Sequence, residues 1–112
     1  MSRAERDKGA RGEREVVAIL NNNGLRAVRT PNSGGLHVRG DLTGVPGYHF
    51  EVKRQETLRL PTWLRQAQTD AILESGPTAV PVVAWRQNQG EWYAALPLDD
   101  LAKLLDLARL TA

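Results

Sequence analysis

Residues 40–54 read GDLTGVPGYHFEVKR, and this stretch decides which fold the chain can form. The alternation of apolar and polar residues in its second half predicts a strand over residues 48–54, since successive side chains of a strand point to opposite faces. One predicted face carries Phe50 and Val52, and the other carries His49, Glu51 and Lys53. The second face therefore holds a carboxylate and an ammonium group side by side.

Asp41 lies ten residues before Glu51, with a glycine-rich turn between them. A strand that begins at residues 40–42 would place Asp41 next to Glu51 in a hairpin-like geometry. Two carboxylates at such a short distance repel each other unless a cation lies between them, so the pair is a natural magnesium site. Each motif alone is weak, because a Glu-x-Lys triplet is more often an exposed salt bridge and Asp41 more often a turn residue.

Apolar periodicity predicts the remaining elements of the fold. The expected helices cover residues 10–23 and 61–74 and a last segment capped by Asp99, and the expected strands cover 25–29, 78–86 and 91–96. Pro81 favours an edge or a bulge in its strand. Residues 1–9 are predicted to form a mobile basic arm or a loose helical start. The order α-β-β-β-α-β-β-α predicts one α/β domain over residues 1–112, with a mixed sheet flanked by helices.

The composition limits the chemistry that the chain can perform. Hydrophobic residues make up 41% of the 112 residues, and no run approaches the roughly 20 apolar residues of a membrane-spanning helix. The charged start lacks the apolar stretch of a secretory signal, so we expect a cytoplasmic protein with no membrane partner. No cysteine is present, and His37 and His49 are too few for structural zinc. Carboxylates would have to hold any metal, which favours magnesium or manganese.

Charge is distributed unevenly along the chain. Residues 1–65 carry twelve Lys and Arg against seven Asp and Glu, a net +5, whereas residues 66–112 carry three against six, a net −3. A basic first half indicates a polyanionic partner, although an unevenly charged solvated surface explains it equally well. Arg14 and Arg29 are candidates for contacts with backbone phosphates.

Glu13 lies on the apolar stripe of the first predicted helix, four residues before Val17 and seven before Leu20. This position directs the carboxylate toward the sheet. A first-turn acid that complements the helix dipole is an equally good interpretation of Glu13, with Glu15 as its solvated neighbour.

The set formed by Asp41, Glu51, Lys53 and Glu13 could hydrolyse a phosphodiester. A metal ion held by the first two carboxylates would polarise the phosphate, Lys53 would orient water or stabilise developing charge, and Glu13 could bind a second ion. No Ser/His/Asp arrangement and no P-loop spacing occurs, and we expect no small-molecule cofactor.

Four segments in a fixed order resemble the PD-(D/E)XK nuclease superfamily, and within it the archaeal-type Holliday junction resolvases. These segments are KGARGERE at residues 8–15, LRAVR at 25–29 with PNSG at 31–34, Asp41, and EVK at 51–53. The resemblance implies a restriction-endonuclease-like fold. It also implies that Asp41 and Glu51 are metal ligands, that Lys53 is the catalytic lysine, and that Glu13 is the helix carboxylate.

The same resemblance implies a loop serine near the scissile phosphate, matched by Ser33, and a Mg²⁺ ion that Mn²⁺ can replace. Branched DNA is the implied substrate. A homodimer is also implied, because symmetric cleavage of a four-way junction needs two active sites. The basic residues expected to contact DNA are Lys8, Arg11, Arg14, Arg29, Arg54 and Arg65.

The sequence departs from the family pattern at three places, and other functions stay open. Gly40 replaces the proline of the literal motif, and the segment between Ser33 and Asp41 is long. Gln66 resembles a glutamine near the metal of exonuclease-like branches, although an exposed helix glutamine is the favoured interpretation. The alternatives to a junction resolvase are a phage or repair nuclease acting on nicks, flaps or ends, and a non-catalytic DNA-binding module.

Overall fold

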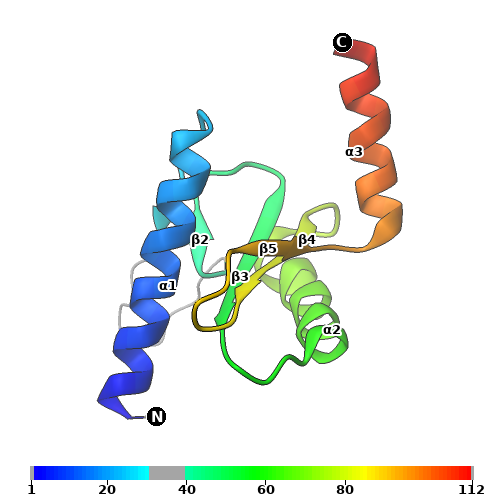
Figure 1. The fold of residues 1–112 in the computed structure, drawn as a ribbon. Coiled ribbons are helices and arrows are strands. Elements are labelled where there is room, and N and C mark those ends of the chain that lie inside the picture. The colour runs from blue at the N-terminus through cyan, green and yellow to red at the C-terminus, as the bar shows by residue number, and fades with distance from the viewer. Residues whose placement is uncertain (1, 31–39, 112) are drawn as a thin grey trace.

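The computed structural model describes residues 2–30 and 40–111, and it contains a five-stranded mixed sheet with helices on both faces (Figure 1). The elements in chain order are α1 (Arg3–Asn22), β1 (Val28–Arg29), β2 (Leu42–Thr43), β3 (Tyr48–Arg54), α2 (Leu60–Asp70), the π-helical turn η1 (Ala71–Ser75), β4 (Val80–Arg86), β5 (Tyr93–Ala95) and α3 (Leu98–Thr111). The predicted α/β class is confirmed, and the predicted order is matched with one π-helical turn added after α2.

The strands lie in the order β1-β2-β3-β4-β5, and only β3 and β4 run parallel. Parallel neighbours need a crossover connection, which α2 and η1 supply. Leu42 of β2 pairs with Phe50 of β3, so the predicted antiparallel arrangement of these two segments is correct. It places the start of β2 beside the middle of β3.

Two hydrophobic clusters fix the helices to the sheet. On the α1 side, Val16 packs against buried residues of β2, β3 and β4, among them Leu42 and Phe50. On the α2 side, Trp63 and Ala67 pack against Val83. Trp63 is thus a core residue, the role that its neighbouring aliphatic residues favour.

The two ends of the fold differ in detail from the sequence-based expectation. The first helix begins at Arg3, where the Ser2 hydroxyl accepts a hydrogen bond from Glu5 N–H at 3.1 Å, so the described part of segment 1–9 is helical. The last helix begins at Leu98, and the prediction of Asp99 as its cap is wrong. Asp99 lies in the first turn, where a negative charge complements the helix dipole.

Pro81 lies in β4, which has a neighbouring strand on each side. Val80 N–H donates to Gly47 O toward β3, so the nitrogen of Pro81, which carries no hydrogen, points the other way. On that side β5 pairs only with residues 83–85. Pro81 therefore occupies a locally unpaired stretch, as its chemistry requires.

Helix α3 projects away from the sheet and has no buried residue (Figure 1). None of the helices in the described part of the chain is long and apolar enough to cross a membrane.

Gly12 and Gly9 of α1 provide a matched test of helix packing. A Cβ atom at Gly12 would lie 3.4 Å from the Trp92 ring and 3.6 Å from Val52, whereas nothing lies within 4 Å of one at Gly9. We expect Gly12→Leu to lower the free energy of unfolding by about 1–3 kcal/mol because it pushes α1 off the sheet. Gly9→Leu should raise that free energy by up to about 1 kcal/mol through helix propensity. Urea denaturation measures both, and equal effects of the two substitutions would contradict this packing.

Candidate active site

Asp41 is fixed against β3 through both its backbone and its side chain. Its N–H donates to Phe50 O at 2.8 Å, and its Oδ2 accepts from Val52 N–H at 2.7 Å. The carboxylate is thus held beside the strand that carries Glu51 and Lys53.

Gly40 explains why the proline of the literal motif is absent. Its φ is +75°, a value that the proline ring forbids, and a Cβ atom there would lie 2.5 Å from Phe50 O. The glycine lets the chain pass close to β3 directly before Asp41. The departure from the family pattern is therefore a consequence of the local backbone.

The charges of the other predicted site residues act on the Asp41 carboxyl group. Burial, and next the negative charge of Glu51, raises the pKa of Asp41 to about 7, and the charge of Glu13 adds to the rise. The hydrogen bond from Val52 N–H and the charge of Lys53 act in the opposite direction. Asp41 therefore lies within electrostatic reach of Glu51 and Lys53 of β3 and of Glu13 of α1.

Glu13 makes an ion pair with Arg29 of β1, with Oε1 and Nε 3.0 Å apart. Its neighbours on the helix stripe, Gly12 and Val16, are buried, and Glu13 itself is half-buried. The structure thus agrees with the interpretation in which the carboxylate points toward the sheet. Arg29, predicted to contact DNA, lies close to the carboxylates rather than on a remote surface.

Glu51 has a buried partner in His49, its neighbour on the same face of β3. His49 Nε2 lies 2.9 Å from Glu51 Oε1, and His49 Nδ1 lies 2.9 Å from the Ser75 hydroxyl. The His49 side chain is fully buried, which the sequence pattern did not indicate. Burial acts to lower the pKa of His49, but the hydrogen bond and charge of Glu51 outweigh it, so the pKa is raised.

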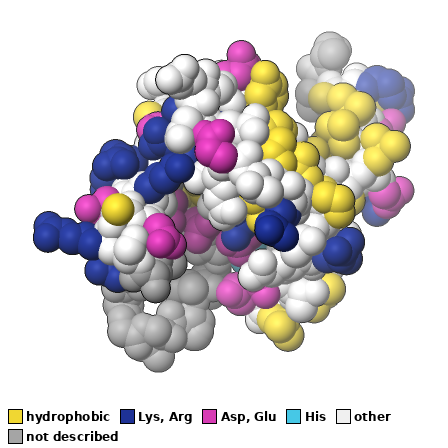
Figure 2. Space-filling view, turned by 60° about the horizontal axis from the view of Figure 1, so that its bottom comes forward, with side chains coloured by type: hydrophobic (Ala, Val, Ile, Leu, Met, Phe, Trp, Pro, Cys, Tyr) yellow, Lys and Arg dark blue, Asp and Glu magenta, His cyan; other side chains and the backbone are white. Residues whose placement is uncertain are grey.

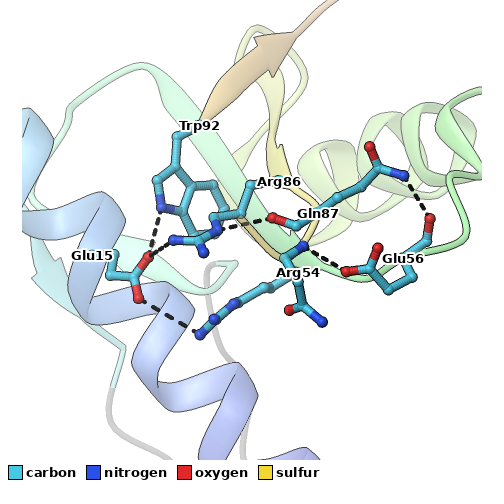
Figure 3. Close-up of polar contacts among 7 residues, drawn as sticks. Glu15, Arg54, Glu56, Arg86, Gln87 and Trp92 are labelled. Carbon is cyan, nitrogen blue, oxygen red and sulfur yellow. Dashed lines mark hydrogen bonds and ion pairs between the residues drawn. The ribbon is translucent and has the colours of Figure 1, made fainter. Parts of the chain in front are cut away.

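The helix-dipole interpretation of Glu13 took Glu15 to be a solvated neighbour, but Glu15 is the centre of a network of polar contacts (Figure 3). It accepts hydrogen bonds from Arg86 Nη1 at 2.7 Å and from Trp92 Nε1 at 2.9 Å, and Arg54 Nη1 lies 3.6 Å away. Burial acts to raise the pKa of Glu15, but the Trp92 hydrogen bond and the two arginine charges lower it overall. These contacts tie α1 to β3, β4 and the segment before β5.

The network of Glu15 has a consequence for Arg54. This residue was predicted to contact DNA, but its side chain is only 17% exposed and is paired with Glu15. Its role in the described structure is to join β3 to α1. Sequence reasoning missed the network because no local pattern connects its members; Arg86 and Trp92 lie 71 and 77 positions from Glu15.

The other predicted DNA-contacting residues lie on the helices. Arg11 and Arg14 are exposed on α1, Lys8 is half-buried there, and Figure 2 shows Lys and Arg side chains gathered on the α1 side of the molecule. Arg65 and Gln66 are exposed on α2. Ser33 and His37 lie outside the described residues.

The donor set fits a hard cation. As they stand, no three His, Asp or Glu side chains among residues 2–30 and 40–111 are grouped closely enough to enclose an ion. Carboxylate oxygens are the donors that Mg²⁺ and Mn²⁺ prefer, so Asp41, Glu51 and Glu13 are the residues that would hold such an ion. Burial and then the charges of Glu51 and Glu13 raise the pKa of Asp41, and a nearby cation would offset the repulsive part of this rise.

The mixed five-stranded sheet with helices on both faces is consistent with the restriction-endonuclease-like fold of the PD-(D/E)XK superfamily. A family model described as "Phage putative PDDEXK endonuclease" matches residues 4–110, and the chain therefore belongs to this family of endonucleases. The match supports the superfamily and does not single out the archaeal-type Holliday junction resolvases. A search of curated proteins found no match.

Gly40 and Gly47 provide a matched test of how Asp41 is positioned. Both have positive φ, but a Cβ atom at Gly47 would meet nothing within 4 Å. We expect Gly47→Ala to cost about 1–2 kcal/mol of stability through backbone strain alone. Gly40→Ala should cost about 1–3 kcal/mol more, because its Cβ displaces the backbone of β3. Urea denaturation of the two variants measures the difference, and equal losses would show that the close approach at Gly40 is not tight.

Proposed function

We propose that this chain is a magnesium-dependent DNA endonuclease whose active site consists of Asp41, Glu51, Glu13 and Lys53. The observation that carries the proposal is the attachment of Asp41 to the strand that holds Glu51 and Lys53, in a member of an endonuclease family. A non-catalytic DNA-binding module is disfavoured, because such a module gains nothing from carboxylates whose repulsion is costly.

In this proposal Asp41 and Glu51 are ligands of Mg²⁺, with Glu13 as a further ligand, and Mn²⁺ can replace Mg²⁺. The bound ion would act as a Lewis acid toward the scissile phosphate. Lys53 would orient the attacking water or stabilise the negative charge that develops on the phosphate oxygens. Arg29, held by Glu13, would neutralise a neighbouring phosphate of the same strand.

The basic side of α1 is the proposed track for the DNA backbone. Lys8, Arg11 and Arg14 follow one another at intervals of three residues, on the helix that also carries Glu13. Phosphate contacts of this kind supply affinity without reading sequence, so binding should weaken as salt rises. Arg65 on α2 would contact DNA from the other side of the carboxylates.

For the substrate we propose a four-way DNA junction, which the enzyme would resolve by paired cleavage. The order of the motifs over residues 8–53 supports this choice, as does an exposed apolar surface suited to a dimer. The family match favours a second candidate, a phage nuclease that acts on nicks, flaps or ends. Both candidates use the same active site and differ in the shape of DNA that they select.

Helix α3 is the proposed site of self-association with a second copy of the chain. Leu98, Leu105, Leu107 and Leu110 are 60–78% exposed, and Ile72 and Leu73 of η1 are 60% and 77% exposed. Figure 2 shows hydrophobic side chains on the side where α3 projects. The helix starts with Asp99 and Asp100 and ends with Arg109, so an antiparallel partner helix would place opposite charges together. Such a two-fold interface suits a homodimer.

The substrate assay tests the proposed function. We expect Mg²⁺-dependent cleavage of a synthetic four-way junction into symmetric nicked duplexes, with linear duplex spared. Asp41→Asn and Glu51→Gln should reduce cleavage at least about 100-fold, because each removes a charged ligand, and should leave junction binding intact by gel shift. Digestion from DNA ends would contradict the four-way junction as the substrate and would support the second candidate, a nuclease that acts on nicks, flaps or ends. Normal cleavage by either variant would refute the site itself.

The dimer prediction has its own measurement. Light scattering at micromolar concentration should give a dimer for the native chain and a monomer for Leu105→Glu/Leu107→Glu, since each change adds a charge to the apolar surface. Leu25→Glu changes an exposed leucine far from α3 along the chain and should leave the dimer intact. A native monomer, or a dimer that survives the double change, would exclude α3 as the interface.

A further inference from the structure

His49 is the only charged or polar residue that is fully buried among residues 2–30 and 40–111. It follows Tyr48 at the start of β3 and points to the face covered by η1, where Ser75 is the last residue of the π-helical turn. Both ring nitrogens are occupied, one by Glu51 Oε1 and the other by the Ser75 hydroxyl, each at 2.9 Å. A buried ring with two such partners cannot rotate without breaking a hydrogen bond.

The direction of the first hydrogen bond follows from chemistry. An ionised carboxylate only accepts hydrogen bonds, so His49 Nε2 carries the hydrogen and donates it to Glu51. In the neutral ring Nδ1 is then an acceptor, and the Ser75 hydroxyl is the donor that fixes this arrangement. In the charged ring Nδ1 donates to Ser75 instead. The contact with Glu51 is the same in both cases.

The π-helical turn gives Ser75 a role that an ordinary helix end would lack. Helix α2 changes from α to π at Ala71, and η1 ends directly before Gly76, whose φ is +105°. Single π-helical turns within α-helices are frequent at functional sites. Here the turn ends with a side chain that hydrogen-bonds His49, whose other ring nitrogen contacts Glu51.

We propose that Ser75 and His49 are positioning residues that fix the Glu51 carboxylate for ion binding. One oxygen of Glu51 is engaged by His49, so the other is the oxygen left for the ion. This inference rests on the proposed function, since it takes Glu51 to be an ion ligand. Substitution of a residue that hydrogen-bonds a metal ligand commonly weakens metal binding by about 10–100-fold.

Mn²⁺ binding to the full chain without DNA, followed by electron paramagnetic resonance, tests the proposal without relying on cleavage. Ser75→Ala should weaken Mn²⁺ binding by roughly tenfold, and Ser75→Thr, which keeps the hydroxyl, should restore it. His49→Phe removes both hydrogen bonds and should weaken binding by at least as much. Thr69→Ala is the matched control, because Thr69 is an exposed hydroxyl residue on α2 that bonds only to Arg65 O.

A double substitution separates positioning from general loosening of the fold. In a Glu51→Gln background, Ser75→Ala should cause no further loss of Mn²⁺ affinity, since its effect acts through Glu51. If Ser75→Ala and His49→Phe both bind Mn²⁺ as tightly as the native chain, the positioning role is overturned. The proposed function still stands in that case, provided that the native chain cleaves DNA. Mn²⁺ binding with these losses but no DNA cleavage would overturn the function and keep the positioning role. A native chain that binds no Mn²⁺ would overturn both.

Discussion

The attachment of Asp41 to β3 is the constraint on which the rest of the site depends. Two short hydrogen bonds, to Phe50 O and from Val52 N–H, fix both ends of the residue against the strand that carries Glu51. They require a positive φ at residue 40, a conformation that glycine adopts without strain. Once Asp41 is fixed there, β2 is in register with β3, and α1 can bring Glu13 close to the same strand.

Patterns within short stretches of sequence predicted much of this arrangement. The alternation over residues 48–54 gave the correct strand, and the spacing of Asp41 and Glu51 gave the antiparallel pairing seen between Leu42 and Phe50. The apolar stripe of the first helix indicated an inward Glu13 as one of two equal interpretations, and the ion pair with Arg29 agrees with it. In each case the relevant partners lie on one element or on neighbouring ones, where the period of the backbone determines which side chains share a face.

The contacts that the sequence did not reveal join residues far apart along the chain. Glu15 binds Arg86 and Trp92, and His49 binds Ser75, and no local periodicity connects these pairs. Arg54 is a further example, because nothing in the local sequence indicates that Glu15 of α1 is its partner. The shift from α2 to a π-helical turn is equally invisible, since the sequence AILES at residues 71–75 continues an ordinary helical pattern.

Each carboxylate of the proposed site has a hydrogen-bond donor of its own. Val52 N–H serves Asp41, Arg29 serves Glu13, and His49 serves Glu51. Three negative charges in a partly buried cluster would otherwise oppose folding, and these donors offset that repulsion before an ion enters. The donors come from the backbone of β3, from β1 and from the buried core beneath η1. The same contacts that make the cluster compatible with a stable fold therefore also orient its oxygens, so stability and ion binding depend on one set of interactions.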